Sequence, residues 1–359
     1  MGYDPYDSYD LADFSQKGGT KTSFGNKGEL MNLIASAHTA GMQVYADMVT
    51  NHNSGGDAAE PNPIDGKTRW TIFTPACGFF PRNWLCFHPS SYESYDEMSF
   101  GDMPDLCQRD PTVYTQMIAI AQFLIEQVGF DGFRFDFVKG YGPWMVKAIA
   151  EVRYLNKAQQ GFKPFCVGEC WDIDPTISDW LSEVNTFMDN PVSAFDFPLH
   201  YRLKRLCDSY GFSLTDLAQG GVMNVEQPAH AVTFVDNHDT TRDPSNAIIN
   251  DKMLAYAFIL THEGYPCVFW RDYFNYGLAR AGTANAVGGG FDPHLPLQEP
   301  SILRCSYGLF CVSRPVRVEL TGTGTILPRS HAANADGSKR TEPPILNLGI
   351  LLLAASSYA

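Results

Sequence analysis

The sequence predicts an α/β fold in which parallel strands and helices alternate to form a (β/α) barrel of the TIM type. Several short apolar segments of strand length end in acidic, histidine or amide side chains. Segments with helical character separate these strands, among them 27–40 and 112–128. In a parallel barrel the carboxyl ends of the strands meet at one face, and the active site is assembled there from several strands. We therefore expect the polar strand ends to converge on one site.

The strand near 130–136 carries the strongest signal. It alternates apolar and charged residues and ends by projecting Arg134, Asp136 and Lys139 toward one place. A guanidinium beside a carboxylate favours the charged form of the acid, which a carboxylate nucleophile requires. The alternative is a structural ion pair at the rim of the barrel.

Three further segments follow the same pattern. The run 44–52 ends in Asn51-His52, the run 165–171 reaches Glu169, and the run 231–239 ends in His238-Asp239. Three acids on three strands, together with two histidines, make a carboxylate-based active site the leading hypothesis.

These four segments, in this order, resemble the signature regions of the alpha-amylase family of glycoside hydrolases. The resemblance extends from about residue 2 to about residue 282. Within the family, Lys139-Gly140-Tyr141, the opening Gly2–Asp7 and the run from Cys267 to Tyr273 are similar to the plant and archaeal-type branch. The resemblance implies an incomplete (β/α)8 barrel, formed by 1–52 and 105–281. Strands three to eight of this barrel are expected near 43–49, 130–136, 164–168, 194–197, 231–235 and 266–270, with two strands missing and two sheet edges left open.

The resemblance also implies a retaining mechanism with two carboxyl groups. Asp136 corresponds to the nucleophile, Glu169 to the general acid/base and Asp239 to the third acid, which grips sugar hydroxyls. Apolar neighbours of Glu169 in the sequence favour a raised pKa. The implied substrate-binding residues, the last two of them less firmly matched to the family, are Tyr3, His52, Arg134, His238, Lys139 and Trp171.

The implied reaction is endo-hydrolysis of alpha-1,4-glucosidic bonds in starch or glycogen. The alternatives are a transglycosylase of the same family, or a catalytically dead fragment that at most binds glucan. Asp47 and Asp236 are expected to be structural, and Asp131 to cap or pair outside the site.

The segment 53–104 is rich in glycine, proline and aromatic residues and is longer than an ordinary connection. The resemblance implies that it is an inserted domain after strand three, domain B, attached to the barrel by calcium. Calcium prefers carboxylate, amide and carbonyl oxygens. The implied ligands are Asn51, Asp96, Asp105 and the Gly140 carbonyl, with a further carbonyl near Met98. The alternative is that the two aspartates cap loops.

A second metal site, for zinc, is implied by His88 and Cys107. In the related archaeal-type proteins a second histidine stands where this chain has Glu93. Glutamate is also a zinc ligand. Otherwise His88 and Cys107 are packing residues.

Composition limits the remaining function classes. The chain has 359 residues and a net charge of −14, which argues against nucleic-acid binding and suits a neutral glucan partner. No segment predicts membrane insertion, and we expect a monomer. The resemblance implies a secreted protein, and we expect no signal peptide within the residues given. Among nine cysteines, Cys77 and Cys86 are close enough in sequence to form a bridge.

The last part of the chain does not resemble the family. Residues 281–359 contain five acidic and six basic side chains, whereas the preceding part is strongly acidic. We expect 282–359 to be a disordered or aberrant tail. Its apolar run 346–355 is too short to cross a bilayer as a helix.

Overall fold

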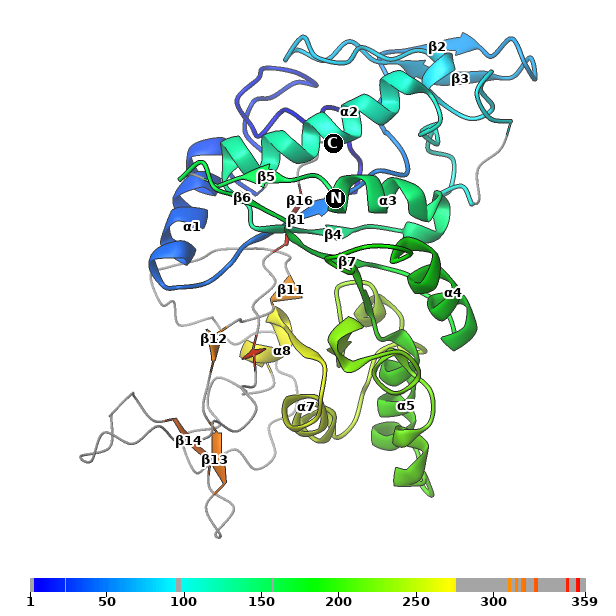
Figure 1. Ribbon diagram of the computed structural model, residues 1–359. Helices are drawn as coiled ribbons and strands as arrows, with labels where there is room; N and C mark the ends of the chain where they lie inside the picture. Colours follow the sequence, from blue (N-terminus) through cyan, green and yellow to red (C-terminus); the bar gives the residue numbers. More distant parts are fainter. Residues whose placement is uncertain are drawn as a thin grey trace.

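The computed structural model describes residues 3–22, 24–94, 98–156 and 158–275, together with six short strands further along the chain (Figure 1). Among these residues, no helix has the length and apolar character needed to cross a membrane.

Six parallel strands form the centre of the fold, in the same order in space as in the sequence. They coincide with the six predicted strands, so the sheet is an incomplete (β/α)8 barrel, as expected. Their carboxyl ends lie at the same edge because neighbouring strands are parallel and paired residue by residue. The strands are β1 (Tyr45–Met48), β4 (Gly132–Phe135), β7 (Phe165–Gly168), β8 (Ser193–Phe195), β9 (Ala231–Phe234) and β10 (Tyr265–Phe269).

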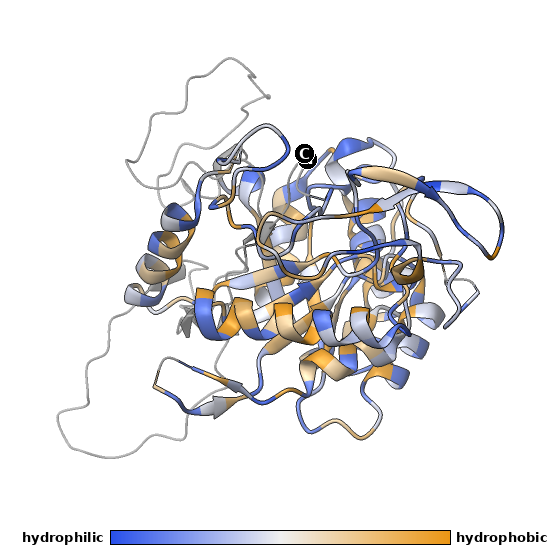
Figure 2. Cartoon of the chain, turned by 90° about the horizontal axis from the view of Figure 1, so that it is seen from above, coloured by the Kyte–Doolittle hydropathy of each residue, from blue (hydrophilic) through white to orange (hydrophobic). Residues whose placement is uncertain are grey.

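These strands are buried on both faces, which explains their nearly continuous apolar sequences. Figure 2 shows apolar residues concentrated on the sheet and on the helices packed against it. The charged exceptions are Arg134 in β4, which is 2% exposed, and Asp47 in β1, which is 3% exposed. A buried arginine in a central strand requires acidic partners.

Helices connect the strands and pack beside one another, with α2 against α3, α3 against α4, and α5 against α7. Local signals explain where they start. Asn26 and Glu29 form a capping box at α1, and Asp110 caps α2, whose first residue is Pro111. The helices are α1 (Lys27–Thr39), α2 (Pro111–Gln122), continued by a π-helical turn (Phe123–Val128), α3 (Pro143–Ala150), α4 (Asp174–Val184), α5 (Phe197–Asp208), α6 (Val222–Val225), α7 (Lys252–Thr261) and α8 (Trp270–Asn275).

The inserted segment contains a two-stranded antiparallel sheet, β2 (Ala58–Pro61) and β3 (Thr68–Ile72), and a short 3₁₀ turn at Trp84–Cys86. Figure 1 shows this hairpin beyond α2, outside the central sheet. Cys77 and Cys86 are both free thiols. The bridge considered from their sequence spacing is therefore not formed.

Two strands from the end of the chain pair with the edges of the sheet. β16 (Leu353–Ala355) lies parallel to β1, and β11 (Leu309–Phe310) lies antiparallel to β10. The expectation of two open edges is therefore wrong where β16 pairs with β1 and where β11 pairs with β10. Between 276 and 359 the structure describes only these two and four more short strands, so the predicted disorder of 282–359 stays a prediction. The four others are β12 (Arg314–Pro315), β13 (Val318–Leu320), β14 (Ile326–Pro328) and β15 (Asn347–Leu348).

Candidate active site

Arg134 brings together acids from three neighbouring strands. Its Nη1 lies 2.8 Å from Asp47 Oδ1 at the end of β1 and also forms an ion pair with Asp136, just after β4. Its Nη2 lies 2.7 Å from Glu169 Oε2, just after β7. The predicted convergence of Arg134, Asp136 and Glu169 is thus present. Asp47, expected to be structural, completes the cluster by orienting the guanidinium.

The charges around Arg134 are unequal, since one guanidinium faces three buried carboxyl groups. Burial raises the pKa of Glu169 to about 8, and the charges of Asp136 and Asp239 add to this, while Arg134 opposes it. Burial also raises the pKa of Asp47. Glu169 therefore carries a proton at neutral pH and is able to act as an acid.

The turn after β4 fixes the position of Glu169. Phe137 has φ of 46°, in the left-handed region that a bulky residue rarely adopts. Its backbone N–H donates to Glu169 Oε2 at 3.2 Å, and Glu169 N–H donates to the Phe135 carbonyl at 2.9 Å. The strained turn at Phe137 therefore serves to direct an amide at the carboxyl group.

Asp239 follows β9 and has two basic neighbours. Its Oδ2 lies 3.0 Å from His238 Nε2, and its Oδ1 lies 3.1 Å from Arg242 Nη1. Burial raises the pKa of Asp239, but His238, Arg242 and Arg134 outweigh this, so the pKa is lowered overall. Asp239 is consequently the ionised member beside a protonated Glu169. Sequence reasoning missed Arg242, although its place three residues after Asp239 was a usable signal.

Tyr3 joins the site from the start of the chain, as predicted. Its hydroxyl donates to Asp47 Oδ2 at 2.7 Å, and its ring stacks on His238 with centroids 5.2 Å apart and planes 3° apart. Arg134 lies over the same ring, 5.6 Å from its centroid. Tyr3 and His238 therefore form one wall next to the acids.

His52 is fully buried rather than exposed to an incoming sugar. Its Nε2 lies 3.1 Å from the Tyr3 carbonyl oxygen, and its ring stacks on Phe100 at 4.9 Å. Phe100, which also contacts Phe137 edge-on, was not singled out from the sequence. In this arrangement His52 supports Tyr3 from behind.

Lys139 and Trp171 lie further along the loops. Lys139 Nζ is 3.0 Å from Asp172 Oδ2. Trp171 Nε1 donates to the Tyr201 hydroxyl at 2.9 Å, and its ring stacks on Phe197. Lys139 therefore lies in the loop that follows Asp136, and Trp171 in the loop that follows Glu169.

The expected structural roles of two other acids are confirmed. Asp131 binds His38 Nε2 at 2.9 Å and accepts from the Val44 amide at 2.8 Å, away from the acid cluster. Asp236 is fully buried and binds Lys252 at 2.8 Å.

Three of the expected calcium ligands lie close together. Asn51 Oδ1 is buried and has no hydrogen-bond partner among the described residues, while its Nδ2 donates to Asp105 Oδ1 at 3.1 Å. A Cβ built on Gly140 would lie 1.9 Å from Asn51 Oδ1, so the backbone of Gly140 approaches this oxygen directly. An orphaned amide oxygen beside a carboxylate and a backbone turn fits a hard cation. Asp96 lies outside the described residues.

The residues considered for zinc also converge. His88, Glu93 and Cys107 each offer one ligand atom, and these atoms all lie within 4.8 Å of one another. Nitrogen, oxygen and sulfur donors at this spacing fit a tetrahedral zinc ion.

At adjoining strand ends of a parallel (β/α) barrel, one arginine binds a protonated glutamic acid and an aspartate. These are the two carboxyl groups that glycosidic-bond hydrolysis uses. Residues 4–274 match the family described as alpha amylase, catalytic domain. The chain belongs to the alpha-amylase family of glycoside hydrolases.

Several named relatives are similar to this chain along most of its length. It is 33% identical over 334 residues to an alpha-amylase of Geobacillus stearothermophilus, covering 76% of this chain and 58% of that protein. It is 30% identical to the probable alpha-amylase 2 of Arabidopsis thaliana, covering 77% and 65% respectively. A glucan 1,4-alpha-maltohexaosidase of Bacillus sp. strain 707 is 30% identical, with 83% and 65% covered. The chain thus spans 58 to 65% of the length of these relatives.

Solved structures support the fold. The crystal structure of a three-domain cyclomaltodextrin glucanotransferase superposes with a TM-score of 0.53 at 23% identity, covering 76% of this chain and 55% of that one. An Anoxybacillus alpha-amylase gives a TM-score of 0.50 at 22% identity, with 81% and 57% covered.

Proposed function

We propose that this chain hydrolyses alpha-1,4-glucosidic bonds within starch- or glycogen-type glucans and retains the anomeric configuration. The observation that carries the proposal is that Arg134 binds both Asp136 and Glu169, while the pKa of Glu169 is raised to about 8. Glu169 is therefore able to act as an acid, and it lies beside Asp136, a second carboxyl group that the same guanidinium orients.

In the first step Asp136 attacks the anomeric carbon while Glu169 gives its proton to the leaving glycosidic oxygen. The carbon–oxygen bond to the leaving sugar breaks, and an ester forms between the sugar and Asp136. In the second step the Glu169 carboxylate takes a proton from water, which attacks the same carbon and releases Asp136. Two inversions at one carbon give net retention.

The neighbours of the two acids support glucan binding. Asp239 has a lowered pKa and would accept hydrogen bonds from sugar hydroxyls. The stacked rings of Tyr3 and His238 supply an aromatic wall of the type that packs against a sugar face. Relatives named as alpha-amylases and as a maltohexaosidase act on alpha-glucans, as their names state.

Calcium is proposed as the structural cofactor. The Asn51 side chain, the Asp105 carboxylate and the Gly140 carbonyl would hold it, and the orphaned Asn51 Oδ1 supports this. When bound, the ion would tie the two ends of the inserted segment, at Asn51 and Asp105, to the turn that follows Asp136. Zinc is proposed at His88, Glu93 and Cys107, where it would link the inserted segment, which carries His88 and Glu93, to Cys107 just beyond its end.

The test is release of reducing ends from soluble starch in the presence of calcium, with Asp136→Asn and Glu169→Gln as matched variants. We expect both variants to lose nearly all activity and the wild-type product to form with the alpha configuration, observed by proton NMR before mutarotation. Equal release by wild type and Asp136→Asn would refute the assignment of the nucleophile. Glucan binding by a folded wild type that releases nothing would favour the binding fragment, and longer products from maltooligosaccharides would favour a transglycosylase.

A further inference from the structure

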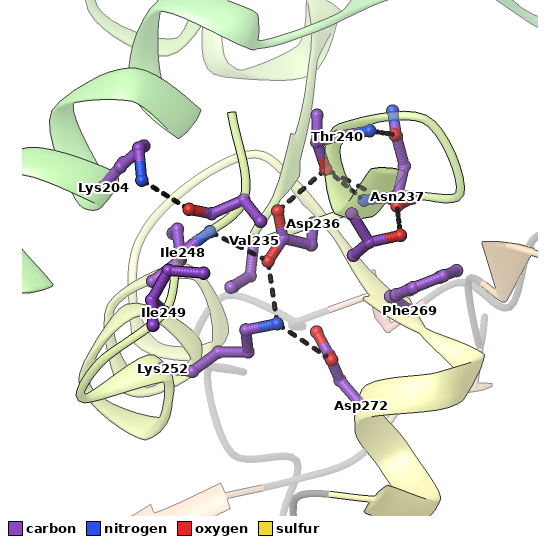
Figure 3. Close-up of polar contacts among 12 residues, drawn as sticks. Lys204, Val235, Asp236, Asn237, Thr240, Ile248, Ile249, Lys252, Phe269 and Asp272 are labelled. Carbon is purple, nitrogen blue, oxygen red and sulfur yellow. Dashed lines mark hydrogen bonds and ion pairs between the residues drawn. The ribbon is translucent and has the colours of Figure 1, made fainter. Parts of the chain in front are cut away.

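A buried cluster of charges lies behind the loop that carries Asp239, and the chemistry of the site does not use it. Lys252, the first residue of α7, has its Nζ 2.8 Å from Asp236 Oδ2 and 3.0 Å from Asp272 Oδ1 (Figure 3). The three side chains are at most 4% exposed. Removing one partner of such a cluster leaves an uncompensated buried charge, so its members act as a unit.

Asp236 connects this cluster to both ends of the loop. Its Oδ1 accepts from the Thr240 hydroxyl at 2.7 Å, and its Oδ2 accepts from the Ile248 amide at 3.2 Å. Asp236 itself lies two residues after the end of β9. The start, the middle and the end of the segment 236–248 therefore meet at one carboxylate, as Figure 3 shows.

Hydrogen bonds continue from Thr240 to the backbone of Asp239. The Thr240 hydroxyl accepts from the Asn237 amide at 2.9 Å. Asn237 Oδ1 in turn accepts from the amides of Asp239 at 2.9 Å and Thr240 at 2.8 Å. These amides donate to side chains instead of to a helix or a sheet, so their order depends on the network.

The other side of the cluster is anchored to the barrel. The Tyr256 hydroxyl donates to Asp272 Oδ2 at 2.7 Å, and the Phe269 amide at the end of β10 donates to the Tyr256 oxygen at 3.3 Å. Tyr256 lies on α7 and Asp272 on α8. Lys252 therefore joins the loop that carries Asp239 to a buried part of the barrel formed by α7, α8 and β10.

We propose that Lys252 is a positioning residue for the reaction. It neutralises Asp236, and through Thr240 and Asn237 this fixes the backbone of Asp239 beside the reacting sugar. The inference rests on the proposed function, in which Asp239 contacts the sugar. Lys252 acts only through other residues. Its expected signature is a loss of turnover with substrate binding largely kept, because Asp239 acts mainly in the transition state.

The experiment compares Thr240→Val, which removes the hydroxyl without changing the charge, with Lys252→Met. Thr261→Val and Lys163→Met are the matched controls. Thr261 lies on α7, as Lys252 does, but donates its hydroxyl to the Ala257 carbonyl at an exposed position. Lys163 forms a long 3.8 Å surface pair with Asp189.

We expect kcat to fall about ten- to a hundredfold in both test variants with KM within about twofold, since a misplacement of roughly 1 Å can cost about a hundredfold. Hydrogen exchange should become faster at the amides of Asn237, Asp239, Thr240 and Ile248 while the central strands keep their protection. Both controls should match the wild type in kcat and in exchange.

Folded test variants with wild-type kcat and wild-type exchange in the loop would overturn the proposal. So would a Thr240→Val protein that keeps its kcat while Lys252→Met loses protection uniformly along the chain, because Lys252 would then serve only global stability. A wild type that releases no reducing ends refutes the proposed function instead. The exchange rates of the four amides then decide by themselves whether Lys252 orders the loop.

Discussion

The guanidinium of Arg134 lies 2.7 Å from the carboxyl group of Glu169, yet the pKa of Glu169 is raised to about 8. An arginine at this distance normally lowers the pKa of a carboxyl group. Here the same guanidinium also binds Asp47 and Asp136. Burial and the neighbouring negative charges therefore outweigh the one positive charge, and the proton remains on Glu169.

Activity should accordingly decline as the pH rises through about 8, the pKa of Glu169. The reason is that departure of the leaving sugar requires the protonated form of this residue. The pH profile of kcat/KM on a maltooligosaccharide is the measurement, because it reports the free enzyme. A profile that stays level from about pH 7 to about pH 9 would contradict the assignment of Glu169 as the acid.

The same pKa predicts how stability varies with pH. The pKa of Glu169 is higher in the folded chain than its ordinary value of 4.5. Its contribution to stability is thus fully present below 4.5 and is lost as the pH rises to about 8. Each unit of pKa difference corresponds to about 1.4 kcal/mol. Urea unfolding at about pH 5 and pH 8 should show a lower free energy of unfolding at the higher pH, and Glu169→Gln should reduce this difference. An equal difference in wild type and variant would be inconsistent with a buried, protonated Glu169.

Replacing Arg134 should be strongly destabilising. Arg134→Gln leaves three buried acids without their shared cation, and breaking a buried ion pair in this way costs about 3–5 kcal/mol. Arg69→Gln is the matched control. Arg69 binds Asp65 through both of its terminal guanidinium nitrogens, at 2.9 and 2.6 Å, but on the surface, where such a pair contributes little to stability. Denaturant midpoints compare the two, and equal losses would contradict a central role for Arg134.

The six parallel strands could be predicted from the sequence because each is a short apolar run that ends in polar residues. The meeting of Asp136 and Glu169 followed from the rule that parallel strand ends share one edge. Asp47 was harder to assign, since its sequence position marks it as buried but does not reveal that it shares Arg134 with the two acids.

Other features depend on contacts between distant segments. Lys252 stands 16 residues from Asp236 and 20 from Asp272, and a lysine at the start of a helix is ordinarily solvated. Phe100 stacks on His52 from the inserted segment, nearly fifty residues away. The outer strand partners of β1 and β10, which are β16 and β11, come from beyond residue 300. No local pattern encodes such pairs, because packing of the whole fold decides them.

Calcium should stabilise the chain against heat. A ligand that binds only the folded state adds about 2.7 kcal/mol at a hundred times its dissociation constant. We expect Tm to rise with added calcium, to fall with a chelator, and to lose this response in Asn51→Ala. Asn32→Ala, on the exposed side of α1, is the control and should respond as the wild type does. A wild-type Tm that is the same with calcium and with chelator would exclude the proposed site.

The backbone at Gly140 should tolerate no side chain. A Cβ there would lie 1.9 Å from Asn51 Oδ1 and 2.7 Å from the Phe137 ring, so Gly140→Ala must displace one of the proposed calcium ligands or the turn that directs an amide at Glu169. Gly19→Ala is the control, since no atom lies within 4 Å of the added Cβ. We expect Gly140→Ala to lower Tm, to weaken the calcium response and to reduce kcat together, while Gly19→Ala changes none of the three. Loss of kcat with a normal calcium response would assign Gly140 to the Phe137 turn alone, and a Gly140→Ala protein that matches the wild type in all three would show that the close approach to Asn51 has no role.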